Sequence, residues 1–207
     1  MQTILRENRI FFICYALFLC AATYYLLTHE QGDEILFFSD HRTTLGDFFF
    51  SCWTHVGELY IYIILFAYFA VRHRRAAYYV LGILIMVGIA SWFTKDLYDA
   101  DRPYRFFTIN GTWNKIHPVE GVDLNTGHNS YPSGHTMSSF ALFSLVAFWM
   151  RNKTWVTLLL FLTAALVGIS RIYLVQHFLR DVWSGSMIGV YLACAAYTIF
   201  RERLHHK

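Results

Sequence analysis

The chain has 207 residues, of which 56% are hydrophobic and only 15% are charged, and its formal net charge is +3. Soluble domains carry about 25% charged residues, so this composition excludes an ordinary soluble protein and indicates an integral membrane protein. No nucleic-acid partner is expected.

Six apolar segments approach the roughly 20 residues that a helix needs to cross a hydrocarbon core about 30 Å thick. In chain order they cover residues 10–27, 48–71, 76–94, 132–150, 155–173 and 182–200. The sequence therefore predicts an all-α fold in which six transmembrane helices form a bundle, within a single domain over residues 1–207. The boundary of the second helix is the least defined, because His55 and Glu58 fall inside it.

The first segment follows Arg6 and Arg9, much as the apolar part of a signal peptide follows its basic residues. It runs for about 18 residues and no small-x-small cleavage site follows, so we expect a retained helix. The cysteines suggest neither a disulfide framework nor a metal-binding CxxC pair. They are Cys14, Cys20, Cys52 and Cys194.

Basic residues are distributed unevenly between the two sides of the predicted bundle. If six helices alternate, one side holds ten of the seventeen Lys and Arg residues but only two of the fourteen carboxylates, Glu7 and Glu202. An excess of Lys and Arg in short loops marks the cytoplasmic side, so both termini are predicted to be cytoplasmic. The ten are Arg6, Arg9, Arg72, Arg74, Arg75, Arg151, Lys153, Arg201, Arg203 and Lys207.

Three polar motifs lie on the opposite, outer side. The first is KDLYDADRP, from Lys95 to Pro103, where the third helix gives way to a loop over about 96–131. The second is PSGH, at the start of the fourth helix, and the third is SRIYLVQHFLRD, from Ser170 to Asp181. A loop of this length between helices is more often functional than accidental.

The first candidate role for these motifs is phosphate binding. Lys95, Arg102 and Arg171 are cations that repel one another unless an anion lies between them, and phosphate fits both the arginine fork and the lysine point charge. Ser133 and Gly134 begin a helix, where backbone N–H groups and the helix dipole attract an anion. The sequence therefore predicts a phosphate site formed by these five residues.

Two histidines supply what hydrolysis of a phosphate ester needs, a nucleophile and an acid for the leaving oxygen. Asp181 follows His177 by four residues, on the same face of a helical turn, where it can orient the imidazole through Nδ1–H. His135 has no such carboxylate nearby in sequence and is the better candidate for the acid. The residues alone leave the opposite assignment open, and each motif alone also fits an interfacial anchor, a helix entry or a polar pair.

Several other residues have weaker interpretations. Gly185 and Gly189 form a GxxxG that indicates close packing within the bundle, and Arg180 has no assigned role. An outer aromatic group is interpreted as an interfacial belt, with lipid-chain contact as the alternative: Phe37, Phe38, Phe48, Phe49, Phe50 and Trp53. Ordinary loop polarity explains the residues that flank the first two motifs, with headgroup contact as the alternative: Asp99, Asp101, Arg105, His128, Asn129 and Tyr131.

The three motifs together resemble the signature motifs of the type 2 phosphatidic acid phosphatase superfamily, which includes bacterial lipid phosphatases, glucose-6-phosphatase and vanadium haloperoxidases. KDLYDADRP, PSGH and SRIYLVQHFLRD match the pattern without departure. The resemblance implies metal-free and cofactor-free hydrolysis through a phosphohistidine, with His177 as nucleophile, Asp181 as its orienting partner and His135 as acid. It also implies that the phosphoryl oxygens are held by Lys95, Arg102, Ser133, Gly134 and Arg171.

We therefore expect a membrane phosphatase of the bacterial inner membrane, with its active site facing the periplasm or outer surface and a lipid phosphate of the bilayer as substrate. Undecaprenyl diphosphate, phosphatidylglycerophosphate, phosphatidate and a lipid A phosphate all fit. Neither the lipid nor the oligomeric state follows from the sequence.

Three alternatives to hydrolysis remain. A lipid hydroxyl instead of water would make the protein a phosphotransferase that uses the same residues. A metal enzyme would use His135, His177 and Asp181 as ligands, although three nearby cations disfavour a divalent metal. A transporter would place charge along its pathway, whereas the charges here cluster at one surface.

Overall fold

The computed structural model describes residues 2–150 and 154–205, with backbone alone for residues 2, 3 and 200–205. Within these ranges every regular secondary-structure element is a helix. Its α-helices in chain order are α1 (Gln2–Glu7), α2 (Arg9–Thr28), α3 (Asp33–Asp40), α4 (Thr44–Trp53), α5 (Leu59–Arg72), α6 (Arg74–Leu97), α7 (Pro103–Ile109), α8 (Gly134–Trp149), α9 (Thr154–Tyr173) and α10 (Leu179–His205). Two 3-10 helices, η1 (Thr54–Gly57) and η2 (Trp113–Lys115), complete it. The prediction of an all-α fold is confirmed.

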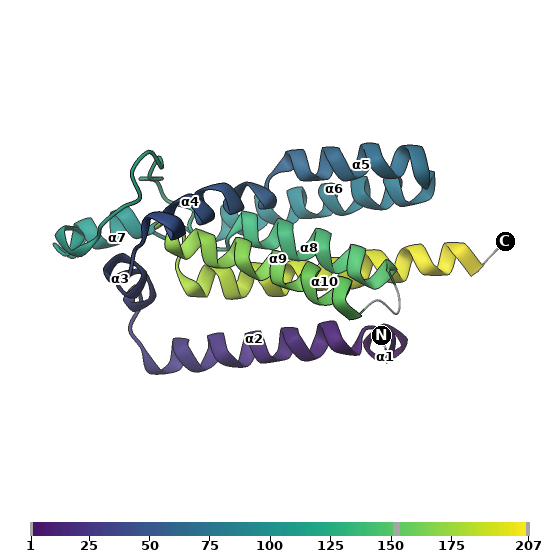
Figure 1. Cartoon of the computed structure of the whole chain (residues 1–207), viewed down its shortest axis with the longest axis horizontal. Coiled ribbons are helices and arrows are strands. Elements are labelled where there is room, and N and C mark those ends of the chain that lie inside the picture. The colour runs from purple at the N-terminus through teal and green to yellow at the C-terminus, as the bar shows by residue number, and fades with distance from the viewer. Residues whose placement is uncertain (1, 151–153, 206–207) are drawn as a thin grey trace.

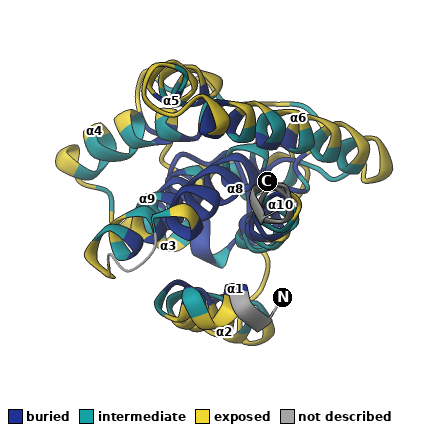
Figure 2. Cartoon of the chain, turned by 90° about the vertical axis from the view of Figure 1, so that its right-hand side faces the viewer, coloured by how far each residue is buried: buried dark blue, intermediate teal, exposed yellow. Residues whose placement is uncertain are grey.

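Helix α8 forms the centre of the bundle. It contacts α6, α9, α10 and η1, and every side chain from Thr136 to Phe148 is buried. Figure 2 shows α8 in dark blue between the α5–α6 pair on one side and α2 on the other, with the exposed residues on these outer helices. Helix α8 is therefore surrounded by protein, and the outer helices present the apolar surface.

The GxxxG of α10 explains how closely α10 approaches α8. A Cβ atom on Gly189 would lie 2.5 Å from the carbonyl oxygen of Met137, and one on Gly185 would lie 2.7 Å from that of Ser133. Only glycine permits this separation. The interpretation of Gly185 and Gly189 as a packing contact within the bundle is confirmed.

The predicted helix over residues 48–71 is wrong as a continuous element. Helix α4 ends at Trp53, η1 follows, and α5 begins at Leu59, with a bend of 57°. The cause lies at Gly57, where a Cβ atom would meet Val167 Cγ1 at 2.8 Å and the carbonyl oxygen of His135 at 3.1 Å. The chain bends here because the backbone of η1 packs directly against the start of α8.

Within the described residues, four helices are long and apolar enough to cross a membrane: α2, α6, α9 and α10 as far as Ile199. A fifth span results if α4, η1 and α5 are taken together. Helix α8 has 16 residues and a length of about 24 Å at 1.5 Å per residue, less than a hydrocarbon core about 30 Å thick. The count of six spans therefore remains a prediction.

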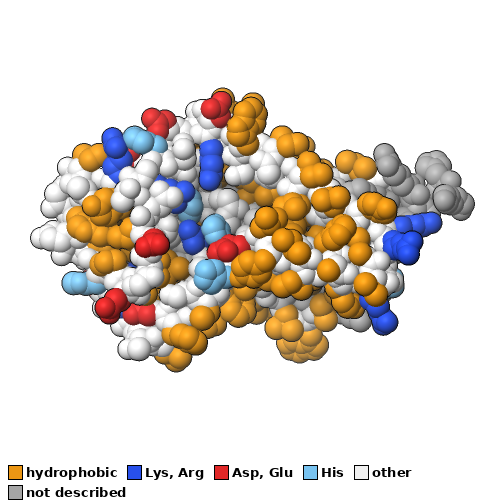
Figure 3. All heavy atoms as spheres, turned by 90° about the horizontal axis from the view of Figure 1, so that it is seen from above, with side chains coloured by type: hydrophobic (Ala, Val, Ile, Leu, Met, Phe, Trp, Pro, Cys, Tyr) orange, Lys and Arg blue, Asp and Glu red, His pale blue; other side chains and the backbone are white. Residues whose placement is uncertain are grey.

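The two ends of the bundle differ in the elements and in the charged side chains that they carry. In Figure 1 the N-terminus, the α5–α6 turn and the C-terminus lie at one end, and α3 and α7 lie at the other. Figure 3 shows apolar side chains over the middle, with Lys and Arg at the right-hand end and a mixed group of basic, acidic and histidine side chains toward the left. Arg151, Lys153 and Lys207, three of the ten basic residues assigned to the cytoplasmic side, lie outside the described residues.

The outer aromatic group has two parts. Phe37 and Phe48 are exposed, as a membrane interface requires. Phe38 and Phe50 instead pack against Tyr173, with ring centroids 5.5 and 4.5 Å apart. The group therefore anchors α3 and α4 to the end of α9 in addition to presenting aromatic surface.

Candidate active site

The three sequence motifs converge at the end of the bundle that carries α3 and α7. Lys95 lies in the last turn of α6, Arg171 in the last turn of α9, and Asp181 in the first turn of α10. His135 is the second residue of α8, and Arg102 immediately precedes α7. Because consecutive helices of the bundle alternate in direction, these helix ends meet in one place.

His177 and Asp181 form a buried pair. The side chain of His177 is 3% exposed and that of Asp181 is fully buried, and His177 Nδ1 lies 3.4 Å from Asp181 Oδ2. Oδ2 also accepts hydrogen bonds from the Ser130 hydroxyl at 2.5 Å and from the Phe178 backbone N–H at 3.1 Å. These donors compensate the buried carboxylate, which orients the imidazole from its Nδ1 side.

The other ring nitrogen of His177 faces Arg102, whose Nη1 lies 3.4 Å from Nε2 and donates to the Gln176 carbonyl at 3.1 Å. Arginine has only donors, so Nε2 presents its lone pair and the proton resides on Nδ1. Burial lowers the pKa of His177 to about 4, Asp181 partly offsets this, and the charges of Arg102 and Arg171 reinforce it. The imidazole is therefore neutral at pH 7 with Nε2 unprotonated.

The turn that carries His177 has a strained backbone. Val175 has φ of 58°, a left-handed conformation that is a genuine outlier for a β-branched residue. The N–H groups of Gln176 and His177 both donate to the Arg171 carbonyl, at 2.9 and 3.1 Å. The turn therefore couples the backbone of Arg171 to the position of the imidazole.

Ser133 caps the helix that carries His135. Its Oγ accepts hydrogen bonds from the N–H and the hydroxyl of Thr136, at 3.5 and 2.9 Å, and its own N–H donates to the Asp181 carbonyl at 3.0 Å. Since Ser133 N–H is occupied, the next N–H groups of the first turn, those of Gly134 and His135, are the ones available for an anion.

The cations surround this helix start. A Cβ atom on Gly134 would lie 3.9 Å from Lys95 Nζ, so the lysine reaches the first residue of α8. Arg171 donates to the Thr54 hydroxyl at 2.6 Å. His135 lies within the electrostatic influence of Lys95, Arg102 and Arg171. The structure thus brings together all eight residues that the sequence predicted for the site.

A cavity of about 420 Å³ opens beside this group. Its lining includes Thr54, Glu58, His135, Arg171 and Gln176. It gives a ligand of headgroup size access to one of the predicted cations and to the predicted acid. In Figure 3 the same region shows basic, acidic and histidine side chains close together.

Sequence reasoning missed four residues that contact this group: Thr54, Glu58, Ser130 and Gln176. Ser130 lies two residues before the second motif and Gln176 lies within the third, but neither carries a recognisable spacing of its own. Thr54 and Glu58 fall inside an apolar segment, where a polar residue is a signal of function, although in the sequence Glu58 indicates no more than an uncertain helix boundary. Their contacts join segments far apart in the chain, so no local pattern indicates them.

The residues that flank the first two motifs pair mainly with each other. His128 Nδ1 lies 3.0 Å from Asp99 Oδ1 and 3.4 Å from Asp101 Oδ1, and Arg105 Nε lies 2.8 Å from Asp101 Oδ1. Asn129, whose φ is 71°, offers its carbonyl to Arg102 Nη2 at 3.4 Å. Loop polarity accounts for the first four, whereas Asn129 supports the site through its backbone.

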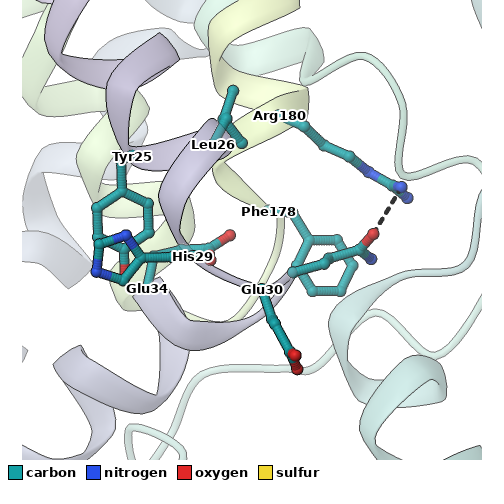
Figure 4. A pocket seen from close by; sticks show the side chains of 8 residues that line it. Tyr25, Leu26, His29, Glu30, Glu34, Phe178 and Arg180 are labelled. Carbon is teal, nitrogen blue, oxygen red and sulfur yellow. Dashed lines mark hydrogen bonds between the residues drawn. The ribbon is translucent and has the colours of Figure 1, made fainter.

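Arg180 belongs to a second pocket on the other side of the His177 turn, with a volume of about 200 Å³. Its guanidinium donates to Gln31 Oε1 at 2.7 Å, and Figure 4 shows the Arg180 side chain with this hydrogen bond dashed. In the same pocket Glu34 accepts hydrogen bonds from the Gly32 N–H at 3.1 Å and the Leu179 N–H at 2.8 Å. Glu34 thereby satisfies the N-terminus of α10, directly after the histidine turn.

No group of three or more His, Cys, Asp or Glu side chains within the described ranges has the arrangement of a metal site. His177 and Asp181 contact each other through Nδ1 and Oδ2, and His135 is adjacent to the cations. The three residues considered as metal ligands therefore do not converge on one point.

Taken with the apolar outer helices, this geometry defines a class: a helical membrane protein with a buried histidine, its carboxylate partner and a group of cations at one end of the bundle. The sequence model of the PAP2 superfamily matches residues 75–205, more than half of the chain. The chain belongs to the PAP2 superfamily, and it is an integral membrane protein.

Similar proteins include phosphatidylglycerophosphatase B of Bacillus subtilis (strain 168), 25% identical over 138 residues that cover 59% of this chain and 68% of the relative. The crystal structure of Aquifex aeolicus LpxE matches with a TM-score of 0.67 at 22% identity, over 81% of this chain and 94% of that one. The crystal structure of a transmembrane PAP2 type phosphatidylglycerolphosphate phosphatase from Bacillus subtilis matches with a TM-score of 0.56 at 21% identity, over 95% and 96%. At these identities the structures establish the fold. The chain spans half or less of the length of the similar Arabidopsis thaliana lipid phosphate phosphatases.

Proposed function

We propose that the chain, as a single domain over residues 1–207, is a membrane phosphatase that hydrolyses a lipid phosphate or diphosphate through a phosphohistidine on His177, without a metal or cofactor. The observation that carries the proposal is the alignment of Asp181, His177 and Arg102. A carboxylate lies 3.4 Å from Nδ1 and a guanidinium lies 3.4 Å from Nε2. A phosphoryl group bound by Arg102 therefore lies against the nitrogen that attacks it.

The proposed reaction has two steps. In the first, Nε2 of His177 forms a bond to phosphorus while the ester P–O bond breaks, and the leaving oxygen takes a proton from His135. In the second, water attacks phosphorus, its proton passes to His135, the N–P bond breaks with its electron pair returning to Nε2, and inorganic phosphate leaves. Asp181 stabilises the charge on His177 throughout.

The cations stabilise the transferring group. Lys95, Arg102 and Arg171, with backbone N–H groups at the start of α8, surround a phosphoryl dianion and counter the charge that develops on its oxygens. Gly134 lies next to Lys95 and offers its backbone N–H, and Ser133 contributes by capping the helix. This arrangement binds the phosphoryl group that all four candidate lipids share, and so the lipid itself remains to be identified by assay.

We further propose that both termini are cytoplasmic and that the site faces the periplasm or outer surface of a bacterial inner membrane. The basic residues near the termini and in the α5–α6 turn support this orientation, as does the position of the site at the far end of the bundle. Reporter fusions at either terminus test it. Activity of a reporter that works only outside the cytoplasm, in both fusions, would contradict it.

The test of function is phosphate release by purified protein in EDTA, over undecaprenyl diphosphate, phosphatidylglycerophosphate, phosphatidate, a lipid A phosphate and a soluble phosphate ester. We expect release from at least one lipid, and loss of release with His177→Ala. Full activity of that variant would refute the nucleophile. Label from substrate phosphate that appears on an acceptor lipid would indicate transfer, chelator-sensitive activity restored by one metal would indicate a metal enzyme, and phosphate flux without hydrolysis would indicate a transporter.

A further inference from the structure

The break between α4 and α5 is tied to the active site at three successive points. Thr54 accepts a hydrogen bond from Arg171 at 2.6 Å. Gly57 packs so closely that a Cβ atom there would lie 3.2 Å from His135 Cβ and 3.1 Å from its carbonyl oxygen. Glu58 then adopts an extended backbone, with φ of −94° and ψ of 168°, and precedes α5. The bend therefore brings Glu58 to His135, 77 positions away in sequence.

The Glu58 carboxylate lies between two histidines. Its Oε1 is 2.7 Å from His55 Nδ1, a hydrogen bond, and 3.8 Å from His135 Nε2, a Coulombic contact. The side chains of Glu58 and His135 are 35% and 31% exposed, and both line the cavity of about 420 Å³. Glu58 thus stands at the mouth of the site, on the side of the proposed acid.

Charge explains why this contact matters. Burial is the largest effect that disfavours a charged His135, and repulsion from Arg171, His177, Lys95 and Arg102 adds to it. A protonated His135, which the first step requires, is disfavoured by cations on this scale. In the substrate complex, a bound phosphoryl dianion offsets the charge of the three cations. The leaving oxygen carries little charge until the ester bond breaks, so it does little to stabilise a protonated His135.

Asp181 does not meet this need. Its Oδ2 is occupied by Ser130, Phe178 and His177, and its Oδ1 lies 3.4 Å from Arg180 Nε. Within the described residues, Glu58 is the carboxylate within ion-pair distance of His135. It is also the anionic neighbour of Arg171, so an effect through His135 has to be separated from an effect through phosphate binding.

We propose that Glu58 is a positioning residue that holds His135 in its protonated, proton-donating state, so that the bend in the second apolar segment supplies the acid with its carboxylate partner. This inference rests on the proposed function of His135. It predicts that Glu58 matters when the leaving group needs a proton and not when the leaving group departs without one.

The experiment compares kcat/KM of wild type and Glu58→Gln on two soluble monoesters, a short-chain alkyl phosphate and 4-nitrophenyl phosphate. The ratio kcat/KM reports steps up to departure of the leaving group, which excludes the later attack by water. The alkoxide leaving group of the alkyl phosphate needs a proton in order to depart, whereas the nitrophenolate of 4-nitrophenyl phosphate does not. We expect a loss of roughly tenfold to a hundredfold on the alkyl ester, part of the 10²–10⁴ that a general acid contributes, and a loss of under about threefold on the nitrophenyl ester.

Two further variants make the result specific. In a His135→Ala background, Glu58→Gln is expected to cause no additional loss on the alkyl ester, because the two residues act as one unit. Glu30→Gln, an exposed carboxylate outside the site with the same change of charge, serves as the matched control and is expected to match wild type on both esters.

Failure of the Glu58 inference and failure of the proposed function give different results. Equal losses on the two esters, or a further loss of tenfold in the His135→Ala background, would overturn the role of Glu58 and leave the phosphatase intact. No phosphate release by wild type from either ester or from any of the four lipids would overturn the proposed function, and this inference with it.

Discussion

Arg102 Nη1 lies 3.4 Å from His177 Nε2, and the same guanidinium nitrogen donates to the backbone carbonyl of Gln176, one residue before the histidine. A single cation therefore positions the turn of the proposed nucleophile and, in the proposed reaction, also binds a phosphoryl oxygen. Binding and alignment are coupled through one side chain.

Arg102→Lys removes this fork while retaining a positive charge. Because hydrogen bonds to charged groups contribute about 1.5–3 kcal/mol, we expect kcat/KM for phosphate release to fall about tenfold to a hundredfold. The matched control is Arg105→Lys, whose guanidinium pairs with Asp101 outside the site. Comparable losses in the two variants would show that charge in this loop matters and the fork does not.

His177 is expected to titrate far below an ordinary histidine. Burial lowers its pKa from 6.5 to about 4, so between these values the folded protein keeps the imidazole neutral whereas an unfolded chain protonates it. Stability should therefore fall as pH decreases through this window. Nitrogen-15 NMR of labelled histidines in detergent, with His177→Gln for assignment, measures the pKa directly, and a midpoint near 6.5 would refute the prediction.

Ser130→Ala removes the donor that lies 2.5 Å from Asp181 Oδ2. An under-satisfied buried carboxylate costs about 1–3 kcal/mol, and part of this loss should appear as weaker orientation of His177, with kcat reduced about tenfold and KM little changed. Ser144→Ala is the control, since Ser144 Oγ is buried in α8 and has no hydrogen-bond partner among the described residues. A control variant as impaired as Ser130→Ala would indicate a general packing effect.

Gly57→Ala should separate η1 from α8. The added methyl group would meet Val167 Cγ1 at 2.8 Å and the His135 carbonyl oxygen at 3.1 Å, and overpacking of this kind costs about 1–3 kcal/mol. We expect a lower thermal midpoint in detergent and reduced phosphate release. Gly88→Ala in α6, where a Cβ atom meets nothing within 4 Å, is expected to be neutral or to stabilise by about 0.5–1 kcal/mol. If the two variants unfold alike, the close approach at Gly57 is not a constraint.

The sequence was sufficient to predict the helical fold and the convergence of the eight site residues. It succeeded because Lys95, Arg171 and Asp181 sit at helix ends, and alternation of helices through a membrane brings such ends together on one side. Composition also located the apolar segments to within a few residues: α8 begins at Gly134 instead of residue 132, and α10 at Leu179 instead of residue 182.

The sequence was insufficient where a contact joins distant segments. Hydropathy cannot detect that Gly57 faces the His135 backbone, so it joined α4 and α5 into one helix. The hydroxyl of Ser130 and the carboxylate of Glu58 acquire their partners only after folding. The rule that a span needs about 20 apolar residues assumes a helix surrounded by lipid, whereas α8 is surrounded by the other helices.

The helices around α8 separate it from changes in the thickness of the bilayer. Helices in contact with lipid adapt to a thicker or thinner membrane by tilting, and here those helices are the outer ones, which present the exposed apolar side chains. Helix α8, with His135 at its first turn, contacts protein on all sides and is shielded from that adjustment. The backbone that carries the proposed acid should therefore keep its position as α2 tilts to match membranes of different thickness.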